Sequence, residues 1–145
     1  MKMQRDIPPS LDALARLNDD LEGQLQAQGV VAERIGQVRL ILEELACNAI
    51  HHGDCGRDEA PLRLQLRVDA QALVLELHDR GNAFDPSDAP APALYDTLED
   101  RPIGGLGLYM VQQLADALDY RREGDANIVR VTLLDPYSPV LEDLS

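Results

Sequence analysis

The spacing of apolar residues changes once along this chain, from a helical repeat to an alternating one, and this change limits the folds open to it. In the first third, apolar residues recur every three or four positions, which predicts two amphipathic helices in succession. From residue 62 they alternate with polar residues, the pattern of a half-buried strand. The spacing predicts helices over 11–28, 31–52 and 104–116, and strands over 62–68, 73–78, 120–123 and 128–134.

Two helices precede the first two strands and one helix precedes the last two. Because helices and strands do not alternate one by one, the pattern excludes a doubly wound parallel sheet. We expect an α/β fold, more closely an α+β two-layer sandwich with helices on one face of an antiparallel or mixed sheet. One domain is expected over 1–135, followed by a tail over 136–145. Four prolines between 86 and 102 interrupt all periodicity, which is typical of a functional or moving connection.

Cap and turn residues support these bounds. Ser10 is expected to cap the first helix, and Gly29 and Gly53 suit left-handed stops after the first and second helices. Residues 69–72 and 124–127 are expected to form hairpin turns.

The formal net charge of −13 argues against direct binding of nucleic acid or of an anionic membrane surface. It is compatible with a magnesium nucleotide held locally and with a basic protein partner, although an acidic soluble protein of any kind would carry it too. No apolar run resembles a signal peptide or a membrane span. Two cysteines make no disulfide framework, so we expect a cytoplasmic protein.

An acid and an amide, Glu44 and Asn48, stand four residues apart in the second predicted helix and therefore share one of its faces. A carboxylate beside an amide oxygen suits a hydrated divalent cation and a polarised hydroxyl group. A solvated helix face would also explain the pair. The two histidines at 51 and 52 lack a second ligand pair, so we do not predict a metal site there.

Two later motifs strengthen the hypothesis of a nucleotide site. Asp79 follows an apolar strand and would accept a hydrogen bond from an exocyclic amine such as that of adenine, while Gly81 would let the base approach. A simple turn is the plainer alternative. Gly104, Gly105 and Gly107 open the third predicted helix, where free amides attract phosphate; a hinge is the alternative.

The three motifs together resemble the N, G1 and G2 boxes of the Bergerat-fold ATPases, which include gyrase B, Hsp90, MutL and sensor histidine kinases. The boxes are Glu44-x-x-x-Asn48, Asp79-x-Gly81 and Gly105-x-Gly107. The segment Phe84-Asp85-Pro86, the short Pro-rich stretch and residues 101–108 are similar to those of bacterial anti-sigma-factor serine kinases. The resemblance covers 9–134. It departs at Ala83, where many relatives have Gly, and at Leu133, where close relatives often have Lys.

The resemblance implies roles for these residues. Glu44 would be the general base on a substrate serine, Asn48 would coordinate Mg²⁺, and Asp79 with Gly81 would bind adenine. The remaining implied ATP-binding residues are Arg101, Gly104, Gly105, Leu106 and Gly107. The chain would then sequester a sigma factor, phosphorylate a STAS-type antagonist in a partner-switching system, and form a homodimer. A non-catalytic module that only sequesters a partner is the alternative. The catalytic half of a histidine kinase is disfavoured by the length of 145 residues and by the missing dimerisation helix with its phospho-accepting His.

Overall fold

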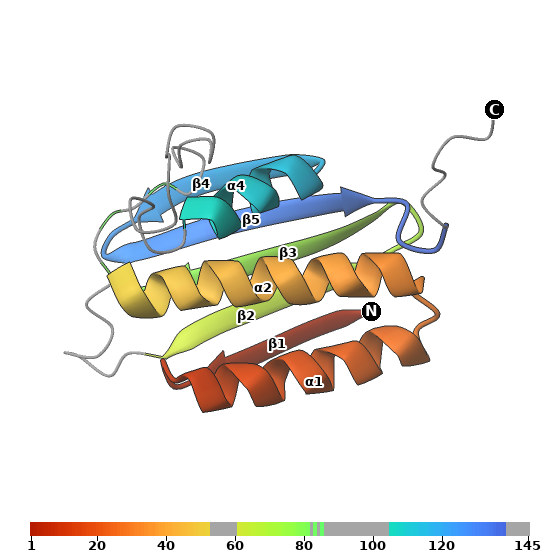
Figure 1. Cartoon of the computed structure of the whole chain (residues 1–145), viewed down its shortest axis with the longest axis horizontal. Helices are drawn as coiled ribbons and strands as arrows, with labels where there is room; N and C mark the ends of the chain where they lie inside the picture. Colours follow the sequence, from red (N-terminus) through yellow and green to blue (C-terminus); the bar gives the residue numbers. More distant parts are fainter. Residues whose placement is uncertain (53–60, 82, 84, 86–104, 139–145) are drawn as a thin grey trace.

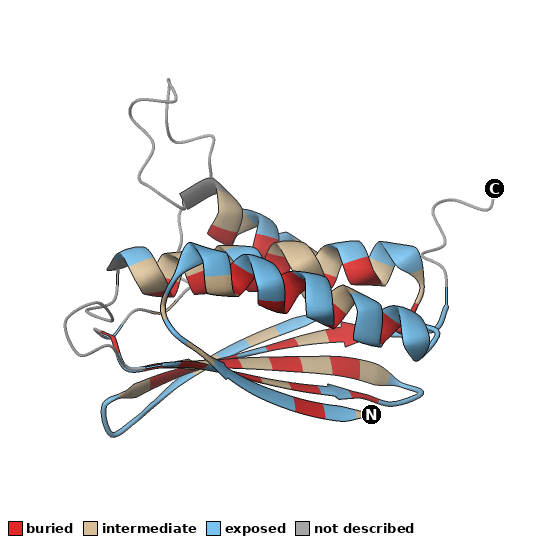
Figure 2. Ribbon diagram, turned by 90° about the horizontal axis from the view of Figure 1, so that it is seen from below, coloured by how far each residue is buried: buried red, intermediate tan, exposed pale blue. Residues whose placement is uncertain are grey.

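The computed structural model describes residues 1–52, 61–81, 83, 85 and 105–138. Within these residues, three helices lie on one face of a five-stranded sheet, as Figures 1 and 2 show, which confirms the predicted two-layer sandwich. The helices are α1 (Leu11–Ala27), α2 (Ala32–His52) and α4 (Gly105–Leu114). The strands are β1 (Lys2–Ile7), β2 (Leu62–Val68), β3 (Ala72–Asp79), β4 (Ala117–Glu123) and β5 (Ala126–Leu134).

The sheet has the strand order β1-β2-β3-β5-β4, and each neighbouring pair is antiparallel. The antiparallel alternative of the prediction is therefore correct and the mixed one is wrong. The predicted order of elements also lacked β1. In this edge strand only Met3 is buried, so the sequence carries no alternation of apolar and polar residues that would reveal a strand.

The bounds near the C-terminus differ from the prediction in two ways. Helix α4 ends at Leu114 instead of 116, because the backbone N–H of Asp116 donates to the Thr132 carbonyl and thereby joins the sheet. Strands β4 and β5 begin earlier than predicted, so Asn127 lies in β5, although the sequence analysis placed it in the hairpin turn.

The core lies between the helices and the inner face of the sheet, and it is aliphatic, as the scarcity of aromatic residues requires. Alternate residues of β2 and β3 are buried and face the helices. The largest fully buried side chains are Leu21, Leu25, Val38, Ile41, Leu42, Leu62, Leu64, Leu73, Leu75, Val111, Val131 and Leu133.

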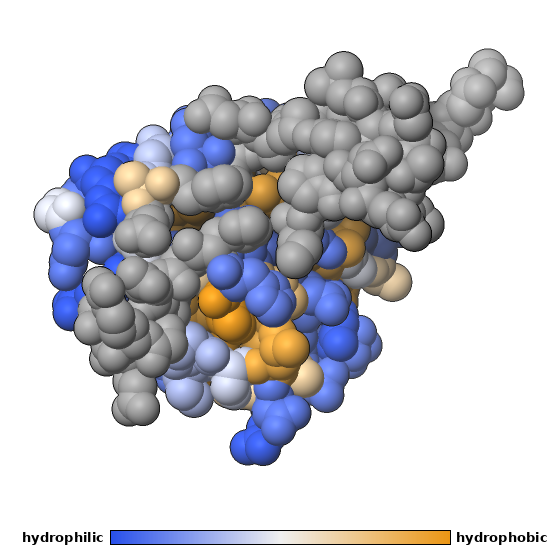
Figure 3. Space-filling model, turned by 60° about the vertical axis from the view of Figure 1, so that its left-hand side comes forward, coloured by the Kyte–Doolittle hydropathy of each residue, from blue (hydrophilic) through white to orange (hydrophobic). Residues whose placement is uncertain are grey.

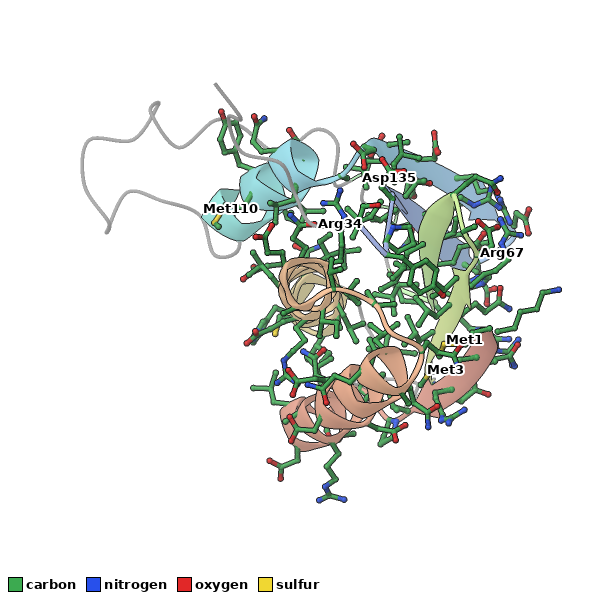
Figure 4. All side chains as sticks on the ribbon, turned by 90° about the vertical axis from the view of Figure 1, so that its right-hand side faces the viewer. Met1, Met3, Arg34, Arg67, Met110 and Asp135 are labelled. Atoms are coloured by element: carbon green, nitrogen blue, oxygen red, sulfur yellow. The ribbon has the colours of Figure 1, made fainter. Side chains whose placement is uncertain are left out.

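Helix α2 lies between α1 and α4 and packs on both, an arrangement that Figures 1 and 4 show from two sides. The side chain of Arg39 fastens it to α1 by donating to the Asn18 carbonyl (3.0 Å) and pairing with Asp19 (3.1 Å). The Ser10 hydroxyl accepts the Ala13 N–H, and Gly29 has a φ of 83°, so both expected caps of α1 are confirmed. The expected stop at Gly53 lies outside the described residues. Among the helices that the structure describes, none is long and apolar enough to cross a membrane.

The residues that directly follow β5 are held in place by backbone hydrogen bonds. The N–H of Asp135 donates to the Gln71 carbonyl (2.9 Å), and the carbonyl of the buried Pro136 accepts the N–H of Val31 (3.1 Å). These contacts join the end of the sheet to the start of α2. The rest of the predicted tail, 139–145, lies outside the described residues.

Candidate functional site

Three segments that are far apart in the sequence converge at one end of the molecule. The end of α2, the end of β3 and the start of α4 meet at the left of Figure 1. The space-filling view of this side in Figure 3 shows apolar side chains at the surface between hydrophilic ones. Each of the three segments carries one of the predicted motifs, so the fold brings the motifs to the same region.

Glu44 of α2 lies directly against the backbone of α4 at Gly107. A Cβ atom placed on Gly107 would overlap the Glu44 carboxylate and come within 3.0 Å of its Cγ. Glycine is the one residue that leaves room for the acid here. The contact joins the first and third motifs, and it sets a half-buried carboxylate beside the opening turn of a helix, where backbone N–H groups favour anions.

The environment of Glu44 makes its carboxylate a better proton acceptor than an ordinary glutamate. Burial raises the pKa of Glu44, and the negative charge of the neighbouring Glu43 raises it further. A base whose pKa approaches the working pH accepts a proton from a hydroxyl group more readily. Glu43 itself is exposed and lies about 100° further round the helix, so it faces away from Gly107.

Asn48 stands one helical turn beyond Glu44 on the same face. Its Oδ1 atom is buried and accepts no hydrogen bond from the part of the chain that the structure describes. A buried carbonyl oxygen without a partner is costly unless a ligand or water satisfies it. Amide oxygen is a ligand type that Mg²⁺ accepts, so the residues present fit the implied metal.

Asp79 ends β3 and is buried, with 7% of its surface exposed. Its Oδ1 atom accepts hydrogen bonds from the Gly81 N–H (2.8 Å) and from Nδ2 of Asn127 (3.0 Å). Oδ2 receives no hydrogen bond from the residues that the structure describes. A fixed carboxylate with one oxygen available is suited to accepting a hydrogen bond from a ligand.

Three residues of this site were missed by the sequence analysis: Tyr120 and Arg122 of β4 and Asn127 of β5. The Tyr120 hydroxyl donates to Asn127 Oδ1 (2.6 Å), and Arg122 Nη1 donates to the same oxygen (3.1 Å) and to the Gly81 carbonyl (2.8 Å). The signal for Asn127 was available: continued alternation from β5 places a polar residue at an inward-facing position directly opposite Asp79.

The predicted site residues therefore divide into three groups. Glu44, Asn48, Asp79, Gly81 and Gly107 lie in the described residues at the convergence of α2, β3 and α4. The backbone of Gly105 and Leu106 opens α4, as expected, although the side chain of Leu106 is not described. Arg101 and Gly104 lie outside the described residues.

Comparison with known families and proteins identifies the family of the chain. The family model of the histidine kinase-like ATPase domain matches residues 7–133. The chain is 31% identical to the serine/threonine-protein kinase BtrW of Bordetella bronchiseptica over 93 residues, which is 64% of this chain and 66% of that protein, just under two thirds of its length. It is 23% identical to the serine-protein kinase RsbW of Bacillus pumilus, over 92% of this chain and 86% of that one.

Two further similarities concern a relative and a solved structure. The chain is 23% identical to the anti-sigma F factor of Clostridium beijerinckii, over 63% of this chain and 64% of that protein. Its fold is similar to a chain in the crystal structure of the SiaB–SiaC complex from Pseudomonas aeruginosa, with a TM-score of 0.65 and 14% identity, over 90% of this chain and 88% of that one.

Proposed function

The chain belongs to the histidine kinase-like ATPase family, and we propose that it is an anti-sigma factor that is also an ATP-dependent protein-serine kinase. It sequesters a sigma factor and phosphorylates a serine of a STAS-type antagonist, which regulates transcription by partner switching. The observation that carries the proposal is the contact of the Glu44 carboxylate with Gly107, because it sets a proton acceptor beside the helix start that would bind phosphate. The names of the sequence relatives, two kinases and an anti-sigma factor, support both halves.

In the proposed mechanism each motif has one task. Asp79 accepts a hydrogen bond from the adenine amine, and Gly81 lets the base lie close to the backbone. The amides that open α4 at Gly105 bind phosphate oxygens. Glu44 accepts the proton of the serine hydroxyl while the serine oxygen attacks the γ-phosphorus and ADP leaves. Mg²⁺, held by Asn48 Oδ1, would supply charge neutralisation on the phosphates when bound.

The proposed partners are proteins in the cytoplasm, without direct nucleic-acid contact. The net charge of −13 repels the phosphate backbone of DNA and favours partners with basic surfaces.

We also propose that the chain is a homodimer. Sedimentation equilibrium would then give twice the monomer mass of 16.0 kDa, and a mass of 16.0 kDa at micromolar concentration would contradict the dimer.

The experiment that tests the proposal is phosphate transfer to STAS-domain proteins. The purified chain is incubated with γ-labelled Mg-ATP and each small STAS-type protein from the same genome. Label on a serine of one of them is the expected result, and it identifies the antagonist. ATP binding by calorimetry without label on any candidate would contradict the kinase and favour the module that only sequesters its partner.

The raised pKa of Glu44 predicts how transfer depends on pH. A general base must be ionised, so the rate of transfer is expected to fall on acidification through the pKa of Glu44, at a higher pH than for an ordinary glutamate. Because the charge of Glu43 contributes to the shift, Glu43→Gln should move this acid limb to lower pH with an unchanged plateau rate. Single-turnover rates measured across pH for both proteins check this; coincident acid limbs would contradict the assignment.

A further inference from the structure

The orientation of the Asn127 side chain is fixed by what surrounds it. Arg122 has only donors, so the atom of Asn127 that faces Arg122 at 3.1 Å must be the oxygen. The Tyr120 hydroxyl donates a hydrogen bond to the same oxygen at 2.6 Å. The amide nitrogen of Asn127 is therefore directed at Asp79 Oδ1, at 3.0 Å. If the amide turned over, its oxygen would face a carboxylate, and the contact would become repulsive.

Arg122 also acts on the turn that follows Asp79. Its Nη1 atom donates to the Gly81 carbonyl at 2.8 Å, while the N–H of Gly81 donates to Asp79 Oδ1 at 2.8 Å. Asn127 Nδ2 lies 3.4 Å from the same carbonyl. One hairpin, β4–β5, thus holds the carboxylate and the turn beside it in a single hydrogen-bonded unit.

We propose that Tyr120 and Arg122 are positioning residues that make the site selective for a nucleotide base bearing an exocyclic amine. They act through Asn127: they keep its amide nitrogen donating to Asp79 Oδ1, which leaves Oδ2 as an acceptor for the amine. This inference rests on the proposed nucleotide binding and deepens it, because it assigns base selectivity to residues that do not belong to the three motifs.

Tyr120 and Arg122 both donate to Asn127 Oδ1, so the losses of ATP affinity caused by replacing them are expected to be non-additive. Tyr120→Phe and Arg122→Ala each leave the other donor on Asn127 Oδ1, and each should weaken ATP binding about threefold. The double variant removes both of these donors from Asn127 Oδ1 and so loosens the amide that orients Asp79, and it should weaken ATP binding about thirtyfold, more than the product of the two. Arg121→Ala is the matched control, because Arg121 lies on the same strand and, among the residues that the structure describes, pairs with the exposed Glu123 and not with Asn127.

The measurement is calorimetric binding of ATP and of purine riboside triphosphate, which carries hydrogen in place of the amine. The expected result is a loss confined to ATP, so that the preference for ATP over the analogue shrinks in the double variant and is unchanged in Arg121→Ala. An equal loss for both nucleotides, or no loss for either, would overturn the positioning role while leaving nucleotide binding intact. Wild-type protein that binds neither nucleotide would instead overturn the proposed function. If the double variant does not fold, as circular dichroism would show, Tyr120→Phe alone still decides by the same ratio.

Discussion

Replacing Glu44 by Gln is expected to lower the rate of phosphate transfer at least about 100-fold, the usual contribution of a general base. The amide has the size of the carboxylate and fits against Gly107, but it cannot accept the serine proton. ATP binding should remain, because the base acts on the hydroxyl group and not on the nucleotide. Single-turnover transfer to the antagonist measures the rate, and calorimetry measures the affinity for ATP.

A general loss of structure cannot explain that result. Folding raises the pKa of Glu44, so its ionised form is disfavoured in the native state, and the stability present below the unfolded pKa is lost as pH rises through the folded pKa. At neutral pH the neutral amide should therefore leave the unfolding temperature equal or higher. Glu43→Gln is the matched control and should keep the plateau rate. Full transfer activity in Glu44→Gln would refute the assignment of the base.

Replacing Gly107 by Ala should lower the rate of phosphate transfer strongly while leaving the stability of the protein almost unchanged. The new Cβ would overlap the Glu44 carboxylate, the end of a flexible side chain, so the acid can turn away while the backbone stays. Misplacement of a catalytic group by about 1 Å can cost 10²-fold in rate, so transfer is expected to fall about 100-fold. Stability should hardly change, because alanine favours the helix by about 1 kcal/mol and offsets the local repacking.

The control for this variant is Gly36→Ala, also within a helix. A Cβ at Gly36 meets no atom within 4 Å, so the substitution should stabilise α2 by about 0.5–1 kcal/mol and leave transfer unchanged. Thermal unfolding and single-turnover transfer are measured for both variants. Wild-type transfer in Gly107→Ala would mean that the Glu44 contact plays no part in catalysis.

The elements that the sequence predicted well are those whose signal is local. Periodicity identified α1, α2, β2 and β3 because each has one buried face, and the order of the motifs indicated the family that the domain comparison confirms. Strand β1 was missed because its pairing with β2, and not its own pattern, makes it a strand. The contact of Glu44 with Gly107 depends on how α4 packs against α2, which no local pattern encodes.

The pairing of the central strands has a consequence for folding. Asp79 stands directly opposite Asn127 in the β3–β5 ladder, and both are buried at the inner face of the sheet. A slip of one residue would turn the core side chains of one strand toward solvent and leave a buried carboxylate opposite an apolar neighbour, Ile128 or Ala126. The polar pair therefore disfavours misaligned pairing of β3 with β5 during folding. Asp79 and Asn127, the pair proposed to bind the nucleotide base, thus also favour the correct register of β3 and β5.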